Sequence, residues 1–570
     1  MAIAADLTAQ FPRRFVPPDA DLGDWAQIEP LLQRLLQTTP EGPEALARWL
    51  EDVSEVLAAV DEVRARRYVA YTVQTDDPER ERAYRAFIEE IQPRLKPLVH
   101  ALDLAYLRNP HRRALPARYA MLDRRVENRV ALFRPENVPL ETEEARLKQQ
   151  YQKVTGAMTV TYRGREHTLP QMARYLEEPD RAVRQEAWEL VARRRLQDRA
   201  TLDDLFDRLL ALRGQIARNA GFSDYRAYAF RLRERFDYTP DDCLRFHDAV
   251  ADVVVPLVRR LHAQRRAALG VETLRPWDLD VDPQGRPPLR PFQRVEELLD
   301  GVEAVFQRID PELAAQFRFL RARGLLDLES RVGKAPGGYQ AEFAEQRVPF
   351  IFMNAVGVDA DVRTLLHEGG HAFHFLASRT EPVLDLREPP IEFAEVASMG
   401  MELLATPHLH VFYPEPADAA RAQRQQYERV LLLFPWVATV DAFQHWVYTH
   451  PEHTRADREA VWTALYRRFH PDVEFSGYED ALATAWHRQL HVFLYPFYYI
   501  EYAIAQMGAL AVWLQARTDP AGAVRRYREA LALAGTRPLP ELFAAAGARF
   551  DLSAEGLRPL ATALAEVLEL

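Results

Sequence analysis

Apolar residues recur three and four positions apart through most of the chain, and this spacing constrains the fold more than any other feature. Residues 31–36 and 45–53 each place their large apolar side chains on one face of a helix. The same pattern returns at 84–107, 141–151 and 180–212, and again from residue 359 to the C-terminus. The sequence therefore predicts a mostly α protein in which many helices each bury one face.

Two short stretches interrupt the helical pattern with strand-like residues. VTYRGREHTL at 160–169 predicts a two-stranded hairpin that turns at Gly164. RVPFIFMN at 347–354 predicts a strand in a small sheet spanning about residues 327–354, and Pro349 favours an edge position for this strand. Five prolines at 276–291 exclude a regular helix there and predict an extended loop.

Composition and charge exclude several classes of protein. The chain has 570 residues and a formal net charge of −11, which argues against a nucleic-acid partner. Its single cysteine, Cys243, excludes a disulfide framework and is expected to be a small core residue. Asp6 interrupts the N-terminal apolar residues, and no apolar stretch approaches the roughly 20 residues of a membrane span. We expect a cytoplasmic protein without a membrane partner.

The motif that carries chemistry is His367-Glu368-x-x-His371, within a predicted helix that begins near Asp359. Two histidines four residues apart lie on one helix face, so both imidazoles can reach one metal ion. Glu368 is rotated by about 100° around the helix axis and lies beside that metal, where a general base for a metal-activated water is needed. Two surface histidines on a helix are the alternative.

Two glycines inside the motif favour the metal site over a plain surface helix. Gly369 and Gly370 each cost about 1 kcal/mol relative to alanine in a helix interior. Their missing side chains would let another backbone, or a substrate, approach the helix closely.

A catalytic zinc normally takes three protein ligands, so a third must come from a neighbouring element. The next predicted helix, after the Pro389-Pro390 break, contains Glu392, Glu395 and Glu402 on one face. The spacing gives three candidates and does not choose among them.

The motifs together resemble those of a known family. HEGGHAFH is followed 24 residues after His371 by Glu395 in EVAS. With LRPWDLDVDP, LESRVGKAPGGY and PFIFMNAVG, this pattern resembles the oligoendopeptidase F and Pz-peptidase branch of the thimet oligopeptidase family of zinc peptidases. The resemblance runs from about Gly221 to Tyr502. It implies one Zn²⁺ per chain held by His367, His371 and Glu395, and it leaves Glu392 and Glu402 supporting or structural roles. His374, one turn beyond His371 on the same helix face, is expected to pack behind these ligands.

A cluster of histidine and tyrosines follows in HRQLHVFLYPFYYIEY. Aromatic residues at such spacing are most often core, but the oxyanion formed in peptide hydrolysis needs donors, and His and Tyr side chains can serve. The resemblance implies that His491, with Tyr499 or Tyr502, stabilises the oxyanion. It places Tyr495, Tyr498 and the Gly337-Gly338 loop near the substrate. Apart from the resemblance, the edge strand expected to end at Asn354 offers free N–H and C=O groups to a substrate backbone, with an ordinary sheet edge as the alternative.

The resemblance implies a large helical shell around a deep substrate channel, with the small sheet next to the HExxH helix. We expect a zinc-dependent oligoendopeptidase that cleaves internal bonds of short unstructured peptides, as a monomer or homodimer. An N-terminal helical region would span residues 1–200 and a catalytic region residues 201–570, the two forming one channelled body. A zinc carboxypeptidase on a related helical scaffold and an inactive peptide-binding relative are the alternatives.

Overall fold

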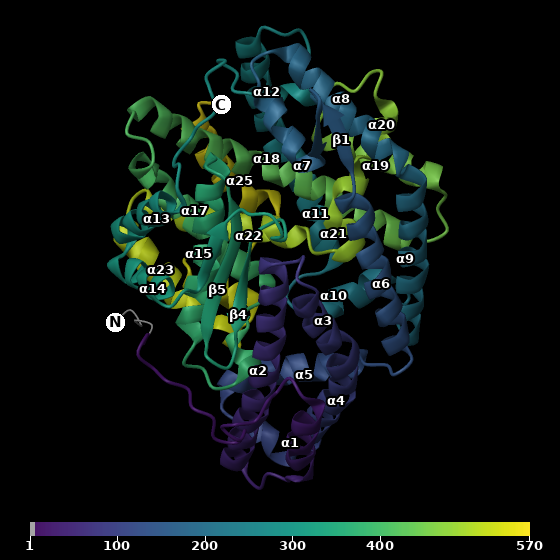
Figure 1. Cartoon of the computed structure of the whole chain (residues 1–570), viewed down its shortest axis with the longest axis vertical. Coiled ribbons are helices and arrows are strands. Elements are labelled where there is room, and N and C mark those ends of the chain that lie inside the picture. The colour runs from purple at the N-terminus through teal and green to yellow at the C-terminus, as the bar shows by residue number, and fades with distance from the viewer. Residues whose placement is uncertain (1–5) are drawn as a thin grey trace. The chain divides into compact units, whose positions relative to one another are not determined.

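The computed structural model describes residues 6–570, which form two compact, mostly helical units (Figure 1). Unit 1 comprises the chain up to Phe133, Leu289–Gln426 and Ile504–Phe550, and unit 2 comprises Arg134–Pro288, Tyr427–Ala503 and Asp551–Leu570. The expected mostly α fold is confirmed. Because the two units interleave along the sequence, the functional division expected at residue 200 stays a prediction.

Unit 1 contains the segment with the HExxH motif. Its helices before the motif are α1 (Trp25–Gln37), α2 (Pro43–Val73), α3 (Pro78–Ala86), α4 (Gln92–Arg108), α5 (Ala120–Leu132), α13 (Val295–Ile309) and α14 (Pro311–Ala322). Those from the motif onward are α15 (Asp359–Ser378), α16 (Leu384–Arg387), α17 (Ile391–Ala405), α23 (Pro520–Leu531) and α24 (Leu539–Ala545).

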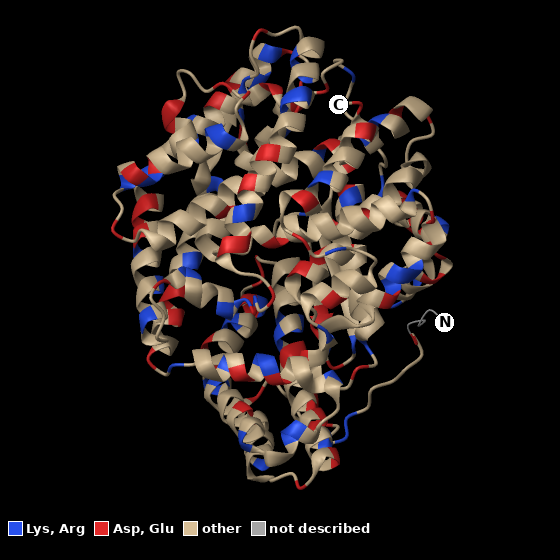
Figure 2. Cartoon of the chain, turned by 180° about the vertical axis from the view of Figure 1, so that it is seen from behind, with Lys and Arg blue, Asp and Glu red and all other residues tan. Residues whose placement is uncertain are grey.

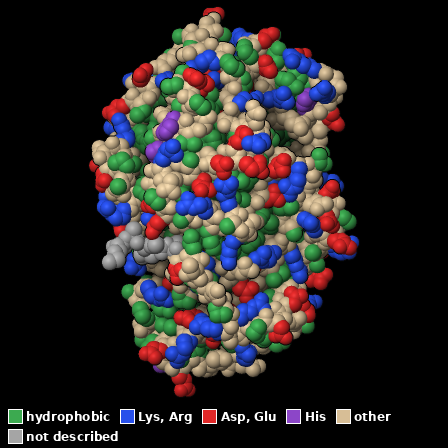
Figure 3. All heavy atoms as spheres, turned by 60° about the vertical axis from the view of Figure 1, so that its left-hand side comes forward, with side chains coloured by type: hydrophobic (Ala, Val, Ile, Leu, Met, Phe, Trp, Pro, Cys, Tyr) green, Lys and Arg blue, Asp and Glu red, His purple; other side chains and the backbone are tan. Residues whose placement is uncertain are grey.

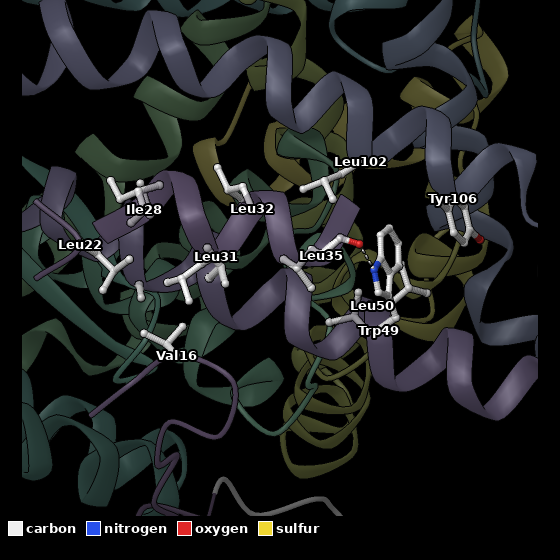
Figure 4. Packing of buried hydrophobic residues seen from close by; sticks show 14 of the residues in the cluster. Val16, Leu22, Ile28, Leu31, Leu32, Leu35, Trp49, Leu50, Leu102 and Tyr106 are labelled. Atoms are coloured by element: carbon white, nitrogen blue, oxygen red, sulfur yellow. Dashed lines mark hydrogen bonds between the residues drawn. The ribbon is translucent and has the colours of Figure 1, made fainter. Parts of the chain in front are cut away.

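The first helices of unit 1 are held by the apolar faces that the sequence predicted. Leu31, Leu32 and Leu35 of α1 are buried against α2 and α4 (Figure 4). The indole of Trp49 packs in the same cluster and donates from Nε1 to the carbonyl oxygen of Leu35 at 3.0 Å. Burial of such side chains contributes roughly 1.5–3 kcal/mol each, so this cluster stabilises the packing of α1 on α2.

The small sheet of unit 1 confirms the strand pattern but corrects one expectation. Its strands are β3 (Leu326–Glu329), β4 (Tyr339–Phe343) and β5 (Val348–Ala355), in the order β3-β5-β4. The strand with Pro349 and Asn354 is therefore central, and the expectation of an edge strand was wrong. Pro349 is tolerated because β3 pairs with β5 only from Ile351 onward, so β4 alone flanks β5 at the proline.

Helix α15, which carries the HExxH motif, packs directly on β5 and on α17 (Figure 1). Its first turn is anchored by Asp361, whose Oδ2 accepts hydrogen bonds from the backbone N–H groups of Val356, Gly357 and Val358. This cap joins the end of β5 to the start of α15 and fixes the motif relative to the sheet.

Unit 2 is also helical, apart from the predicted hairpin. That hairpin consists of β1 (Thr159–Tyr162) and β2 (Arg165–Thr168), paired antiparallel, with Gly164 at φ +75°. The earlier helices of the unit are α6 (Asn137–Gly156), α7 (Leu169–Met172), α8 (Arg181–Gln197), α9 (Arg199–Asn219), α10 (Tyr225–Leu232), α11 (Pro240–Ala249) and α12 (Val255–Leu269). The later ones are α19 (Arg455–Phe469), α20 (Glu479–Ala483), α21 (Leu490–Leu494) and α25 (Ala554–Leu568).

Helices α18 (Pro416–Thr449) and α22 (Ile500–Ala516) contribute residues to both units. Within residues 6–570, α18 alone is long and apolar enough to match the length and composition of a membrane span. Its most apolar window is 72% buried inside the protein, as in the core helix of a globular fold.

Acidic and basic residues are both distributed along the whole chain (Figure 2). On the face shown in Figure 3, acidic, basic and apolar groups alternate over short distances. This mixed surface fits the modest excess of 84 acidic over 73 basic residues.

Candidate metal centre

Three of the predicted residues meet where α15 packs on α17. One ligand atom from each of His367, His371 and Glu395 lies within 4.8 Å of the other two. Glu395 Oε2 is 3.4 Å from His367 Nε2 and 3.6 Å from His371 Nε2. Two imidazole nitrogens and one carboxylate oxygen form a donor set that suits a divalent transition metal with a position left for water or substrate.

The two motif glycines explain how α17 comes so close to α15. A Cβ atom at Gly370 would lie 2.5 Å from the carbonyl oxygen of Ala397 and 2.6 Å from Cα of Ser398. One at Gly369 would lie 2.8 Å from the Phe306 ring. The expectation that another backbone approaches the motif helix is confirmed at Gly370, and this contact brings Glu395 within reach of both histidines.

Glu402 contacts the first histidine from behind. His367 donates from Nδ1 to Glu402 Oε1 at 2.7 Å, and its Nε2 faces Glu395 and His371. Gln426 Nε2 donates to the other oxygen of Glu402 at 2.9 Å. This chain of hydrogen bonds fixes the ring orientation of His367, and because Nδ1 keeps its hydrogen for Glu402, Nε2 is the nitrogen that would lose its proton to bind a metal.

The charge states of the three converging groups follow from burial and their mutual contacts. Burial lowers the pKa of His371 to about 4, so its imidazole is neutral at physiological pH. Burial also opposes a charged His367, but hydrogen bonds to Glu395 and Glu402 outweigh it and raise the pKa of His367 well above its usual value. Burial opposes ionisation of Glu395, yet the two histidines lower the pKa of Glu395 to about 2. Ser398 Oγ adds a hydrogen bond to Glu395 Oε2 at 3.1 Å.

Glu368 lies beside this group and not within it. Its carboxyl group is buried at 7% exposure, and Oε2 has no hydrogen-bond partner among the described residues. The backbone of Gln340 in β4 opposes the rise in pKa that burial imposes on this carboxyl group. Burial raises the pKa of Glu368 to about 7, where a carboxyl group can both accept and donate a proton near neutral pH.

Glu392 and His374 lie on the same two helices but are not part of the metal group. Both are buried at 3% exposure. The His374 ring packs against Phe393 with centroids 5.9 Å apart, and burial lowers the pKa of His374 to about 3. Glu402 makes the hydrogen bond to a metal-site histidine, His367. Support of the metal ligands by Glu392 and His374 stays a prediction.

The side chain of Asn354 makes hydrogen bonds to the loop before β4. Its Nδ2 donates to the carbonyl oxygens of Ala335 and Gly337 at 2.8 and 3.0 Å, which holds the loop before β4. Gly337 adopts φ +98°, and a Cβ at Gly338 would lie 3.1 Å from Thr364 of α15. The loop thus packs against the motif helix, and direct substrate contact by these residues stays a prediction.

The predicted histidine and tyrosines form a cluster in unit 2. The ring centroid of His491 lies 5.0–6.2 Å from the centroids of four tyrosines, namely Tyr495, Tyr498, Tyr499 and Tyr502. These residues do not share one helix: α21 ends at Leu494, and α22 begins at Ile500. Phe497 in the connection has φ +63°.

Two residues that sequence reasoning missed fix the tautomer of His491. Trp436 Nε1 can only donate, and it donates to Gln489 Oε1 at 3.1 Å. The amide nitrogen of Gln489 therefore faces His491 Nδ1, 2.7 Å away, so Nδ1 accepts and Nε2 carries the hydrogen. Trp436 also donates to the Tyr499 hydroxyl at 3.0 Å. Tyr502 Oη lies 3.5 Å from His491 Nε2.

Comparison with known proteins agrees with this geometry. Residues 174–562 match Peptidase family M3, and the chain belongs to that family. An oligoendopeptidase F homolog of Lactococcus lactis subsp. lactis (strain IL1403) is 23% identical over 267 residues, which span 44% of this chain and 41% of that relative. The chain thus aligns with less than half the length of this curated relative.

Solved structures match over nearly the whole chain. A structure of Pz peptidase A with an inhibitor has a TM-score of 0.90 and 26% identity, covering 98% of this chain and 99% of that one. A putative oligoendopeptidase F has a TM-score of 0.90 and 28% identity, covering 98% of both chains. The resemblance inferred from the sequence motifs is confirmed, as is the helical fold with a small sheet beside the motif helix.

Proposed function

We propose that this chain is a zinc-dependent oligoendopeptidase that hydrolyses internal bonds of short, unstructured peptides. One observation carries the proposal: in a chain of Peptidase family M3, His367, His371 and Glu395 converge while the buried carboxyl group of Glu368 lies beside them. This is the arrangement that metal-assisted peptide hydrolysis requires.

His367, His371 and Glu395 would hold one zinc ion. When bound, zinc would act as a Lewis acid toward a peptide carbonyl and would lower the pKa of a water molecule. His371 offers a neutral imidazole, and Glu395 offers an ionised carboxylate. Glu402 keeps the Nε2 lone pair of His367 available by accepting the Nδ1 hydrogen.

Glu368 would move the proton that the reaction transfers. Its Oε2 can accept a proton from the attacking water and return it to the leaving amine. A pKa of about 7 makes both transfers feasible near neutral pH.

His491, with Tyr499 or Tyr502, would supply hydrogen bonds to the oxyanion formed at the scissile carbonyl. The Nε2 hydrogen of His491 and the tyrosine hydroxyls are neutral donors, the kind such a site uses. Burial raises the pKa of Tyr499, which keeps its hydroxyl protonated.

The experiment is hydrolysis of short internally quenched peptides, with products identified by mass spectrometry. We expect internal cleavage that stops on treatment with a chelator and returns with added zinc. Glu368→Gln should lower kcat by about 10²–10⁴-fold while zinc content stays unchanged. Glu415→Gln, which removes an exposed carboxylate in the same unit, is the matched control.

Each alternative has its own outcome. Removal of one residue at a time from the C-terminus would identify a carboxypeptidase. No turnover of several peptides by the zinc-loaded parent, with peptide affinity that survives Glu368→Gln, would identify a binding protein. Either result would overturn the proposal.

A further inference from the structure

A second group of metal-type side chains lies in the core of unit 2. Cys243 and His247 are four residues apart on α11, and Asp441 and His445 are four residues apart on α18. All four are at most 3% exposed. Each helix therefore presents two side chains from one face, the same spacing that brings His367 and His371 together on α15.

The distances within this group match those of a metal site. One ligand atom from each of Cys243, Asp441 and His445 lies within 4.8 Å of the other two. Asp441 Oδ2 is 3.2 Å from His445 Nε2 and 2.9 Å from His247 Nε2. Ligands about 2.0–2.3 Å from a tetrahedral ion are separated by roughly 3.3–3.8 Å, so small side-chain adjustments would complete the geometry.

Hydrogen bonds among the described residues leave part of this group unsatisfied. Asp441 Oδ1 and both ring nitrogens of His445 have no hydrogen-bond partner within residues 6–570. The short approach of His445 Nε2 to Asp441 Oδ2 does not have hydrogen-bond geometry, as expected when two groups are directed toward a common third point. Leaving such buried groups unsatisfied is costly, whereas a bound cation would satisfy them.

The surroundings are buried and aromatic. The rings of Phe230 and Phe497 lie edge-on to His445, with centroids 5.9 and 5.3 Å away. Phe246 of α11 approaches Phe434 of α18 at 6.4 Å and closes the contact between the two helices. An ion enclosed in this way would stay bound permanently and would not exchange readily with solvent.

The charges of the group suit a divalent cation. Asp441 supplies a carboxylate, and both ring nitrogens of the His445 imidazole are unpartnered among the described residues. A carboxylate and a thiolate together would neutralise a 2+ ion in the core.

We propose that Cys243, Asp441 and His445 bind a second transition-metal ion, and that His247 positions the Asp441 carboxylate. Thiolate, imidazole and carboxylate donors select zinc or cobalt over calcium or magnesium. The site is closed, and its ion joins α11 to α18 in a structural role. On binding, the Cys243 thiol releases its proton to solvent, and no oxidation or reduction takes place.

Cobalt tests the proposal sharply because Cys243 is the only cysteine in the chain. A thiolate bound to Co²⁺ gives a near-ultraviolet charge-transfer band that imidazole and carboxylate ligands do not give. Full-length protein is produced in cobalt-supplemented medium so that the closed site loads during folding. We expect two Co²⁺ per chain and the thiolate band.

Variants assign each ion to its site. Cys243→Ala should lose the band and one equivalent of cobalt, and Asp441→Asn or His445→Ala should weaken both. Glu395→Gln, the matched change at the HExxH site, should lose the other equivalent and keep the band. The spectroscopic result is thus independent of whether the chain proves to be a peptidase.

A parent protein with one cobalt per chain and no thiolate band would overturn the proposal. So would a band that Asp441→Asn and His445→Ala both leave unchanged, because the ligand set would then be wrong. The parent alone is decisive even if Cys243→Ala fails to fold. Zinc content of protein from ordinary medium provides a second measurement, expected at two ions per chain and contradicted by one.

Discussion

Oε1 of Glu402 lies 2.7 Å from Nδ1 of His367, on the side of the imidazole that faces away from Glu395. The carboxylate accepts the only hydrogen that a neutral His367 carries and leaves the other ring nitrogen free to bind a metal. Gln426 holds Glu402 from its far side at 2.9 Å. The orientation of one metal-site histidine thus depends on a residue 35 positions away in sequence.

Replacing Glu402 by Gln is expected to weaken zinc binding by about 10–100-fold, the range typical of lost support behind a metal ligand. The amide is a poorer acceptor and no longer opposes the positive charge of the site. Competition with a chromophoric chelator measures the affinity. Glu415→Gln removes an exposed carboxylate in the same unit and is the matched control; equal losses in both variants would contradict the assignment to Glu402.

Gly370→Ala is expected to destabilise the protein by about 3 kcal/mol, because the new methyl group meets backbone atoms of Ala397 and Ser398 that have little freedom to move. Zinc affinity should fall with it, since α17 must shift away from α15. Denaturant unfolding followed by circular dichroism gives the stability. At Gly156 the space around Cβ is open, so Gly156→Ala should be neutral or stabilising by about 0.5–1 kcal/mol. Indistinguishable unfolding midpoints for the two variants would refute this account.

Gln489→Glu is expected to change the pH profile of peptide hydrolysis. A carboxylate at this position accepts a hydrogen from His491 Nδ1, so the neutral ring loses the hydrogen on Nε2 that the oxyanion would need. Only the doubly protonated ring would then donate, so kcat should fall toward alkaline pH, where the ring loses its second proton. Trp436→Phe removes the hydrogen bond that orients the Gln489 amide and adds no charge. This variant should lower kcat without the additional fall toward alkaline pH. A uniform fall in kcat at every pH for Gln489→Glu would indicate a merely structural role.

Glu342 of β4 should make stability decrease toward alkaline pH. Burial, with the nearby Glu388 and Asp61, raises the pKa of Glu342 to about 8, against the opposing Arg387 and Arg64. Between about pH 5 and 8 the folded state therefore holds a proton that the unfolded chain has released, and the free energy of unfolding falls as pH rises.

Glu342→Gln removes this dependence. Relative to the parent, the variant should gain about 1–3 kcal/mol between about pH 5.5 and 8.5, a range reduced because the side chain is partly exposed. Unfolding midpoints at the two pH values provide the measurement, with Glu415→Gln as the exposed control. A difference between variant and parent that does not change with pH would show that Glu342 is ionised in the folded protein.

Local patterns in the sequence predicted most of the elements. The hairpin at residues 159–168, the strand that ends at Ala355 and the helix around His367 all lie where the residue spacing placed them. These features depend on neighbours in the chain, which a sequence displays directly. The convergence of His367, His371 and Glu395 followed from helix spacing together with the family resemblance.

Long-range packing could not be predicted in the same way. Pro349 favoured an edge strand, yet β5 is central, because strand order depends on β3 and on how far its pairing extends. Helix spacing put Glu392 and Glu402 on one face, but the angle between α15 and α17 decides which of them reaches His367. Gln489 gave no signal, since its role comes from Trp436, 53 residues earlier.

The contact between Gly370 and Ala397 also bears on protein engineering. The helix with two of the proposed zinc ligands and the helix with the third touch backbone to backbone, so the distances between ligands are set by main-chain atoms. A designer who transplants the HExxH helix alone would carry over the sequence of the motif without its geometry. The smallest unit that could be transplanted with its geometry is the pair α15 and α17, with the contact at Gly370 intact.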